Sequence, residues 1–395
     1  TAFKTPHLDA LAANGMKFTD FHSSGAVCSP TRAGLMTGRY QQRAGIPGVV
    51  FADPKRKEHK HGLQAIENTF AELLLAEGYN TAMFGKWHLG YETQYNPTKN
   101  GFEEFRGYVS GNVDYFSHVD QAGNFDWWIN DKKQDEEGYS THLITNHAVR
   151  FIEKSDDRPF CLYVAHEAPH YPYQGPNDKA VRKVGAPRNR KENQGVNIKQ
   201  AYREMVQSVD TGVGEIVAAV EKKGLTDETL IMFFSDNGAT KNGSNGRLRG
   251  HKGSVWEGGH RVPFIASWPS RIKAGTTQDQ LAITLDIMPT MLDLAGISLP
   301  TNRRLDGKSL VTALGGGSLE ARTLYWEHGK NLATRRGEWK LVKRGEKAAE
   351  LYNLEQDPEE SSDIAAKNVK RTIGMLQMLL RWKAATMQGA TVQPN

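Results

Sequence analysis

Short apolar runs alternate along the chain with longer segments in which apolar residues recur every three or four positions. The short runs predict buried strands at residues 80–84, 160–165, 230–234 and 262–267, and residues 16–21 alternate like a further strand. The longer period predicts helices at residues 5–15, 69–78, 140–152, 202–224 and 286–294, several of them closed by glycines. A capping box of Thr69 and Glu72 is expected to open the second of these helices, and Ser140 is expected to cap the third. This alternation favours an α/β fold, with a large mixed, mostly parallel sheet sandwiched by helices.

The pattern changes after about residue 320. Residues 331–343 are expected to form a hairpin that turns at Arg336-Gly337, residues 350–354 a further strand, and residues 373–382 a terminal helix. We therefore predict a large domain over residues 1–320 and a smaller C-terminal α+β subdomain over residues 321–395.

The composition is that of an ordinary globular protein, with 38% hydrophobic and 24% charged residues among 395. No apolar run approaches the length of a membrane span, and a net charge of +5 suits an anionic substrate without indicating nucleic acid. We expect no membrane span and no nucleic-acid partner. The two cysteines exclude a disulfide-rich framework, and Cys161, within the apolar run 159–165, is expected in the core.

Two stretches, residues 55–61 and 182–193, are basic and rich in turn-forming residues. The simpler interpretation is a pair of solvated loops. The alternative is a rim that holds a polyanion.

Three predicted strands lead directly into polar segments, which are Gly85-Lys86-Trp87-His88-Leu89-Gly90, His166-Glu167-Ala168-Pro169-His170 and Ser235-Asp236-Asn237-Gly238. Open α/β sheets bind ligands at the carboxyl ends of their strands, so these segments are expected to converge. The Asp236 carboxylate and the Asn237 amide oxygen are hard donors suited to calcium or magnesium. Taken alone, Asp-Asn-Gly is also typical of a simple turn.

Residues 25–39 predict a short helix with Cys28 just ahead of it. Ser29 is a suitable N-cap, Pro30 suits the first helical position, and Gly38 is a natural stop. A helix N-terminus favours negative charge, and Arg32, one turn in, is expected to reach back toward Cys28. The alternative is a small buried cysteine at a helix start.

The pattern Cys28-x-Pro30-x-Arg32, followed by Leu35-x-Thr37-Gly38-Arg39, resembles the signature of the type I sulfatases, in the alkaline-phosphatase-like superfamily. Three further segments resemble motifs of that family in the same order, namely Gly85-Lys86-Trp87-His88, Pro169-His170-x-Pro172, and the glycine-rich block of residues 250–263. The resemblance implies hydrolysis of sulfate esters. It also implies that a formylglycine-generating enzyme converts Cys28 to formylglycine, whose hydrate is the nucleophile.

The same resemblance implies roles for the surrounding residues. Arg32 would support the nucleophile, while Lys86 and Lys252 would hold the sulfate oxygens. His88 would take a proton from the formylglycine diol, and His170 would donate one to the leaving oxygen.

Asp236 and Asn237 would form half of a metal site, for calcium rather than magnesium. Glu257 and Arg261 are expected to be a structural pair. Three further residues are candidates for a sugar pocket, with a surface role as the alternative: Asp114, His118 and His328.

One part of the family pattern has no match. Sulfatases of this kind begin with an apolar strand that ends in an Asp-Asp pair and supplies two more metal ligands, whereas the sequence begins at Thr1, downstream of that strand. We expect the full-length protein to have it. Without it, calcium affinity would fall sharply and a central strand would be missing from the sheet.

The resulting hypothesis is a periplasmic or secreted, formylglycine-dependent sulfatase that acts on a sulfated carbohydrate, such as a marine polysaccharide or a glycosaminoglycan fragment. One alternative is a phosphonate or phosphate ester hydrolase of the same superfamily. The other is an inactive relative that binds sulfated glycans.

Overall fold

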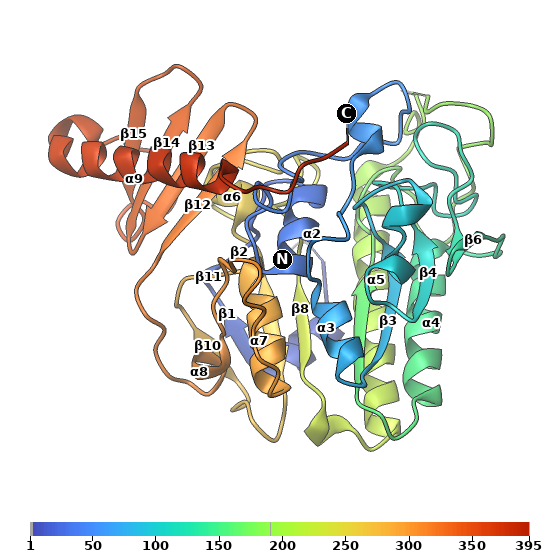
Figure 1. The fold of residues 1–395 in the computed structure, drawn as a ribbon. Helices are drawn as coiled ribbons and strands as arrows, with labels where there is room; N and C mark the ends of the chain where they lie inside the picture. The colour runs from blue at the N-terminus through green and yellow to red at the C-terminus, as the bar shows by residue number, and fades with distance from the viewer. Residues whose placement is uncertain (1–2, 190, 395) are drawn as a thin grey trace.

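The computed structural model describes residues 3–189 and 191–394. It confirms the α/β fold, in which helices cover both faces of a central layer of strands (Figure 1). On one face pack α2 (Cys28–Thr37), α3 (Phe70–Ala76) and α7 (Ile287–Leu294), and on the other α4 (Ser140–Lys154) and α5 (Ile198–Lys222). Alternate residues of β3 (Asn80–Lys86) enter these two cores, Met83 on the first side and Phe84 on the second.

The first half of the central layer is a five-stranded sheet in the order β6-β5-β4-β3-β7. Its strands besides β3 are β4 (Glu104–Tyr108), β5 (Trp128–Ile129), β6 (Lys132–Lys133) and β7 (Phe160–Ala165). β3 pairs in parallel with both β4 and β7, so these three strands end at the same edge. β5 and β6 add antiparallel strands on the outside.

The second half is a four-stranded sheet in the order β10-β1-β9-β8. It contains β1 (Met16–Phe18), β8 (Ile231–Phe234), β9 (Phe264–Ser267) and β10 (Thr276–Gln278). β1 is parallel to β10, and β9 is antiparallel to both β1 and β8. Nearby, β2 (Phe21–His22) pairs in parallel with β11 (Ala282–Ile283), and α1 (Pro6–Ala13) packs against α5 and β9.

The central layer is interrupted between β7 and β8. Within the described residues, β7 pairs only with β3, and β8 pairs only with β9, so each presents one unpaired edge. Both strands contribute to the same apolar cluster under α5, Leu162 from β7 and Ile231 from β8. All four residues of β8 are only half-buried. The expectation of a further central strand is neither met nor contradicted by these residues, and it stays a prediction.

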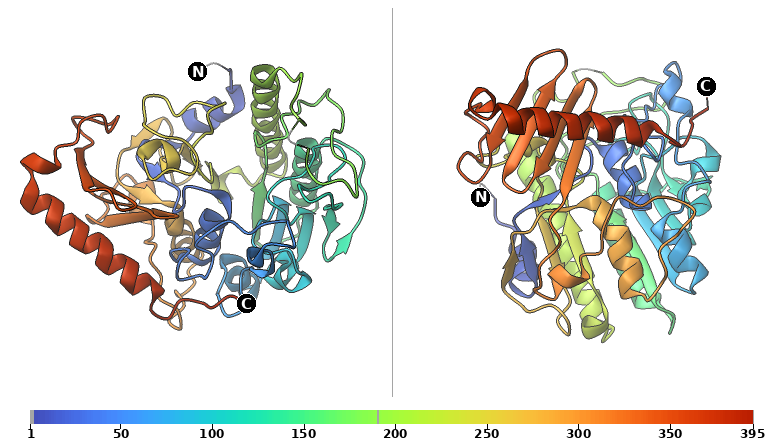
Figure 2. Two further views of the ribbon diagram at one scale, coloured as in Figure 1. Left: turned by 90° about the horizontal axis from the view of Figure 1, so that it is seen from above. Right: turned by 60° about the vertical axis from the view of Figure 1, so that its left-hand side comes forward.

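The C-terminal part forms a separate antiparallel sheet in the order β12-β13-β14-β15. The strands are β12 (Thr323–His328), β13 (Asn331–Arg336), β14 (Trp339–Arg344) and β15 (Ala349–Asn353), and α9 (Val369–Met387) covers one face. The predicted hairpin at Arg336-Gly337, the later strand and the terminal helix are confirmed. Figure 2 shows this sheet and α9 as a lobe beside the central layer.

Two predicted helix caps are wrong. α2 begins at Cys28 with Val27 as its N-cap, because the extended backbone ends two residues earlier than predicted. The Ser29 hydroxyl instead accepts the Val50 N–H at 3.2 Å. Ser140 is already inside α4, and its hydroxyl donates to Glu167 Oε1. The Thr69–Glu72 capping box of α3 and the left-handed stop at Gly38 are confirmed.

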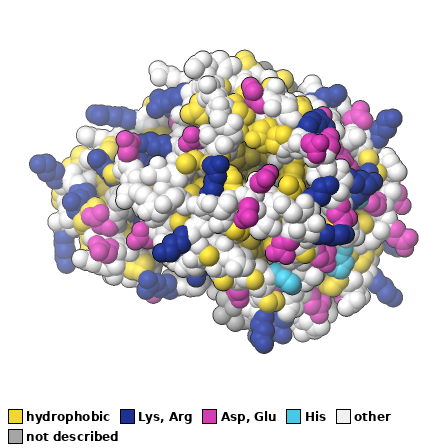
Figure 3. Space-filling view, turned by 90° about the horizontal axis from the view of Figure 1, so that it is seen from below, with side chains coloured by type: hydrophobic (Ala, Val, Ile, Leu, Met, Phe, Trp, Pro, Cys, Tyr) yellow, Lys and Arg dark blue, Asp and Glu magenta, His cyan; other side chains and the backbone are white. Residues whose placement is uncertain are grey.

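The described helices include none that is both long enough and apolar enough to cross a membrane. On the face shown in Figure 3, Lys and Arg side chains are interspersed with Asp and Glu, and hydrophobic side chains gather near its middle. Cys161 is buried in the main core, as predicted, and burial raises the pKa of its thiol to about 12.

Candidate active site

The candidate site gathers around Cys28, the first residue of α2, whose side chain is buried. The Gly253 N–H donates to Ala26 O at 2.8 Å, and the Lys252 N–H donates to Ala239 O at 2.9 Å. These bonds hold the glycine-rich loop against the residues just before α2 and those just after Gly238. As a result, the Lys252 ammonium donates to Cys28 Sγ at 3.2 Å. The Cys28 thiol in turn faces Asn237 Oδ1 at 3.5 Å.

Close backbone packing brings Asn237 to this position. Gly238 N–H donates to Gly259 O at 3.0 Å, in the short helix α6 (Glu257–His260). A Cβ on residue 238 would lie 1.9 Å from Gly258 O, so only glycine lets the two segments meet.

The electrostatic field at Cys28 is positive. Burial and the Asp236 carboxylate both favour the neutral thiol, but Lys252, Lys86 and Arg32 outweigh them and lower the pKa of Cys28. This is the environment of a reactive cysteine and differs from that of Cys161, which has no such cations.

Arg32 lies one turn into α2 and holds three other elements together. Its guanidinium donates to Asp236 Oδ2 at 3.2 and 3.3 Å and to the Tyr163 hydroxyl at 3.2 Å, and it also donates to Lys86 O. Arg32 is expected from the sequence to reach back toward Cys28, and its charge does lower the pKa of the Cys28 thiol. No hydrogen bond joins the two side chains, so the prediction is confirmed only for this electrostatic effect. Asp236 is the partner that directs Arg32 away.

Lys86 ends β3 and is almost completely buried, at 2% exposure. Burial, Arg32 and Lys252 lower the pKa of its ammonium, against the opposing effect of Cys28 and Asp236. Its ammonium makes no hydrogen bond within the described parts of the chain. A buried cation without a fixed partner is suited to bind an anion.

His88 is held in one tautomer. It has a left-handed backbone, with φ of 61°, and its Nε2 lies 2.9 Å from Val50 O. A carbonyl only accepts, so Nε2 carries the proton and Nδ1 is a buried lone pair, without a partner among the described residues. Burial, Lys86 and Arg32 hold the pKa of His88 well below its usual value.

His170 has the opposite tautomer. Its Nδ1 lies 2.9 Å from Tyr171 O and therefore donates, which leaves Nε2 as the free nitrogen. Burial, Lys252 and Lys86 hold its pKa well below the usual value. His166, four residues earlier, has no hydrogen bond at either ring nitrogen in the described structure, and its main charged neighbour is His142 rather than either lysine.

The implied metal does not fit the residues present. Asp236 and Asn237 supply one carboxylate and one amide oxygen, whereas calcium takes about six to eight oxygens. The Asp236 carboxylate is already paired with Arg32, and Arg32, Lys86 and Lys252 together lower its pKa to about 2 in spite of burial. The described residues therefore contain the start of a metal site but not a complete one.

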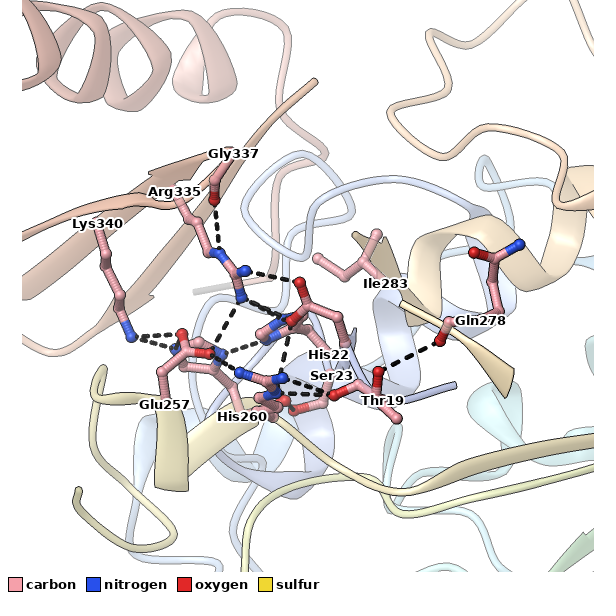
Figure 4. A network of polar contacts seen from close by, with 12 residues as sticks. Thr19, His22, Ser23, Glu257, His260, Gln278, Ile283, Arg335, Gly337 and Lys340 are labelled. Atoms are coloured by element: carbon pink, nitrogen blue, oxygen red, sulfur yellow. Dashed lines mark hydrogen bonds and ion pairs between the residues drawn. The ribbon is translucent and has the colours of Figure 1, made fainter. Parts of the chain in front are cut away.

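A second group, His22, Glu257 and His260, has metal-binding atoms within 4.8 Å of one another. Cations already occupy it: the Lys340 ammonium lies 2.8 Å from Glu257 Oε1, and Arg335 lies 3.2 Å from Glu257 Oε2 (Figure 4). These charges disfavour a metal there. The network instead joins the C-terminal sheet to the loop that carries Lys252, and the expected pair of Glu257 with Arg261, at 3.4 Å, is part of it.

Two of the three candidate sugar-pocket residues are structural. The Asp114 carboxylate accepts several backbone N–H groups, including those of Val181 and Arg182, and the fully buried His118 stacks on Trp127 at 4.3 Å. His328 lies at the end of β12, and its Nε2 is 3.6 Å from the place of a Cβ on Gly253, beside Lys252.

A sequence profile of the family described as Sulfatase matches residues 1–297. The chain belongs to the sulfatase family. A second profile, described as N-sulphoglucosamine sulphohydrolase, C-terminal, matches residues 251–385 of this family member.

Curated relatives of this chain include N-acetylgalactosamine-6-sulfatase of Mus musculus, 32% identical over 83% of this chain, and arylsulfatase A of Homo sapiens, 34% identical over 82%. The chain spans 65% of the length of each. Among solved structures, that of Ps i-CgsB in complex with k-i-k-neocarrahexaose has a TM-score of 0.86 and 31% identity, covering 99% of this chain and 90% of the other.

Some residues around the site could not be found from sequence. Tyr163 lies in an apolar run that reads as core, yet its hydroxyl accepts from Arg32. Val50 acts through its carbonyl, for which the side chain gives no signal. Other residues around the site are marked in the sequence by a polar segment that comes directly after a buried strand. They are Lys86, His88, His170, Asp236 and Asn237.

Proposed function

We propose that this sulfatase hydrolyses sulfate esters of a sulfated carbohydrate, such as a marine polysaccharide or a glycosaminoglycan fragment. The observation that supports this most is the cluster of Lys252, Lys86 and Arg32, whose charges lower the pKa of the Cys28 thiol inside a buried site. A sulfate ester is an anion that needs held cations, a nucleophile and a proton donor. The site offers residues for each of these tasks.

The nucleophile in this proposal is formylglycine, made from Cys28 by a formylglycine-generating enzyme, and its hydrate supplies a hydroxyl group when formed. Lys252, already 3.2 Å from Cys28 Sγ, and the unpartnered Lys86 bind the sulfate oxygens. Arg32 fixes Asp236 and the end of β3, so that both lysines keep their places.

The two histidines act on protons in opposite directions. His88 presents a lone pair at Nδ1 and accepts a proton, because its Nε2 proton is held by Val50 O. His170 presents Nε2 and donates a proton to the leaving oxygen. The lysines that depress the pKa of His170 are the groups that bind sulfate, so a bound anion raises this pKa and favours the protonated form.

We assign this chemistry to residues 1–320, with residues 321–395 as the smaller subdomain, and we place the protein in the periplasm or outside the cell. Calcium is the metal we propose for Asp236 and Asn237. The described residues alone provide too few oxygen donors to hold it.

The test is release of inorganic sulfate, measured by ion chromatography after expression with a formylglycine-generating enzyme. The panel contains 4-methylumbelliferyl sulfate, N-acetylgalactosamine 6-sulfate, N-acetylgalactosamine 4,6-disulfate, a 6-sulfated disaccharide with a uronic acid, carrageenan oligosaccharides and matched phosphate and phosphonate esters. The expected result is sulfate release from at least one sugar, abolished by Cys28→Ala. Faster turnover of the phosphorus esters would favour the phosphonate or phosphate hydrolase. Binding of sulfated sugars without turnover by a converted protein would favour an inactive binding relative.

A further inference from the structure

The basic loop, whose described residues are 181–189 and 191–193, lies against the segment that carries His170. The Val181 N–H donates to Asp114 Oδ2 at 2.7 Å, and the Arg188 N–H donates to Gln121 O at 2.8 Å. The Tyr171 hydroxyl also donates to Gln121, at Oε1 and 3.0 Å. The loop and the His170 segment therefore share the same anchor.

The two described arginines of this loop differ in their freedom. Arg182 is buried and fully engaged, with Nε 3.0 Å from Glu192 Oε2 and Nη1 2.8 Å from Asn112 Oδ1. The Arg188 side chain is 34% exposed, and its Nε lies 2.7 Å from Glu192 Oε1. Glu192 pairs with both arginines. The three side chains together therefore keep a net positive charge, and Arg188 is the one that is exposed.

Tyr171 sets the position of Arg188 relative to the reaction. The Arg188 guanidinium lies 4.2 Å above the Tyr171 ring, and that ring is 4.5 Å from the His170 imidazole. Tyr171 also interacts electrostatically with Lys252. The Tyr171 ring thus separates the Arg188 guanidinium from His170, the proposed proton donor. Nη1 and Nη2 of Arg188 make no hydrogen bond to any other described residue.

We propose that Arg188 is a specificity-determining residue that binds a second anionic group of the substrate, a further sulfate or a uronate carboxylate, next to the sulfate under attack. The inference rests on the proposed function. A planar guanidinium held at Nε by a carboxylate and stacked on a ring is already oriented, and its free N–H groups match sulfate or carboxylate oxygens. The buried Arg182 braces the loop and does not contact the substrate.

The experiment compares Arg188→Gln with Lys183→Gln, which removes the same charge from an exposed position of the same loop. Kinetics are measured on 4-methylumbelliferyl sulfate, N-acetylgalactosamine 6-sulfate, its 4,6-disulfate and the uronate-linked disaccharide. Calorimetry with Cys28→Ala and Cys28→Ala/Arg188→Gln measures binding of the same sugars without turnover. Arg188→Lys keeps the charge but not the fork of N–H groups.

Arg188→Gln is expected to weaken binding and raise KM about tenfold for the sugar with a second anionic group, with little change for the monosulfated compounds. Lys183→Gln should resemble the parent, and Arg188→Lys should fall between. The second anionic group is identified by which sugar, the disulfate or the uronate-linked disaccharide, shows the higher KM in Arg188→Gln. Equal losses on all substrates, or equal losses in Lys183→Gln, would overturn the inference. Absence of sulfate release with Arg188-dependent binding retained would overturn only the proposed hydrolysis, and absence of both binding and turnover would overturn both.

Discussion

At the scale of single residues, the site depends on which atom of each side chain is left free. His88 is buried and His170 is half-buried, and both lie near positive lysines. One backbone carbonyl fixes Nε2 of the first, and another fixes Nδ1 of the second. The free nitrogens therefore differ, and so do the proton transfers we propose for them. The motif resemblance predicts roles for these histidines, but not which ring nitrogen is left free, because carbonyl partners leave no trace in the sequence.

The Cys28 thiol allows a test that does not depend on turnover. In protein expressed without the converting enzyme, Lys252→Ala is expected to raise the pKa of Cys28, because Lys252 has the largest effect among the three cations that lower this pKa. The rate of alkylation by iodoacetamide, followed across pH by peptide mass, measures this pKa. Cys161 serves as an internal control, since burial should keep it unreactive. An unchanged Cys28 profile in Lys252→Ala would contradict the assigned electrostatics.

At the scale of elements, strand ends could be predicted better than helix starts. The apolar runs that form β3, β7 and β8 predict where each strand ends and its polar segment begins, because a short, wholly apolar run is typical of a buried strand. Ser29 and Ser140 are of the residue type that caps helices, but their hydroxyl groups bond to distant segments, at Val50 and Glu167. The sharing of Glu257 between α6 and the C-terminal sheet likewise follows from tertiary packing, which local patterns do not contain.

The network at Glu257 yields a stability prediction. Lys340 is fully buried, with Nζ 2.8 Å from Glu257 Oε1 and 3.0 Å from Glu360 Oε1. Lys340→Met leaves these carboxylates with an uncompensated buried charge, and we expect a loss of about 3–5 kcal/mol of unfolding free energy. Urea unfolding measures it, with the exposed Lys347→Met as the matched control from the same subdomain. A loss no larger than that of the control would show that the network does not stabilise the junction.

At the scale of the whole molecule, the sequence was sufficient for the fold class but not for the division of the sheet. Three of the strands in the central layer, β5, β6 and β10, span only two or three residues, too short to register as apolar runs. The interruption between β7 and β8 lies beside the incomplete metal site, since Asp236 is the second residue after the end of β8. Calcium titration by calorimetry is therefore expected to show weak binding to this chain, and tight binding would contradict the donor count.

Buried neutral histidines predict how stability depends on pH. Burial lowers the pKa of His22, His88, His166, His170 and His260, so below about pH 6.5 the unfolded chain binds protons that the folded chain does not. The free energy of unfolding should then fall by more than about 2 kcal/mol between pH 7.5 and 5.5. Glu167, whose pKa burial raises to about 7, acts in the opposite direction, and burial also raises the pKa of Glu72, Asp120 and Glu360. Equal or higher stability at pH 5.5 in urea unfolding would contradict this prediction.

The most direct test of the central claim combines two measurements on one sample of protein expressed with a formylglycine-generating enzyme. Peptide mass determines the fraction of Cys28 converted to the aldehyde, and ion chromatography determines the sulfate released from the sugar panel. The account predicts that sulfate release rises in proportion to the converted fraction and disappears in Cys28→Ala. Sulfate release by the fully unconverted protein, or none by a fully converted one, would contradict it.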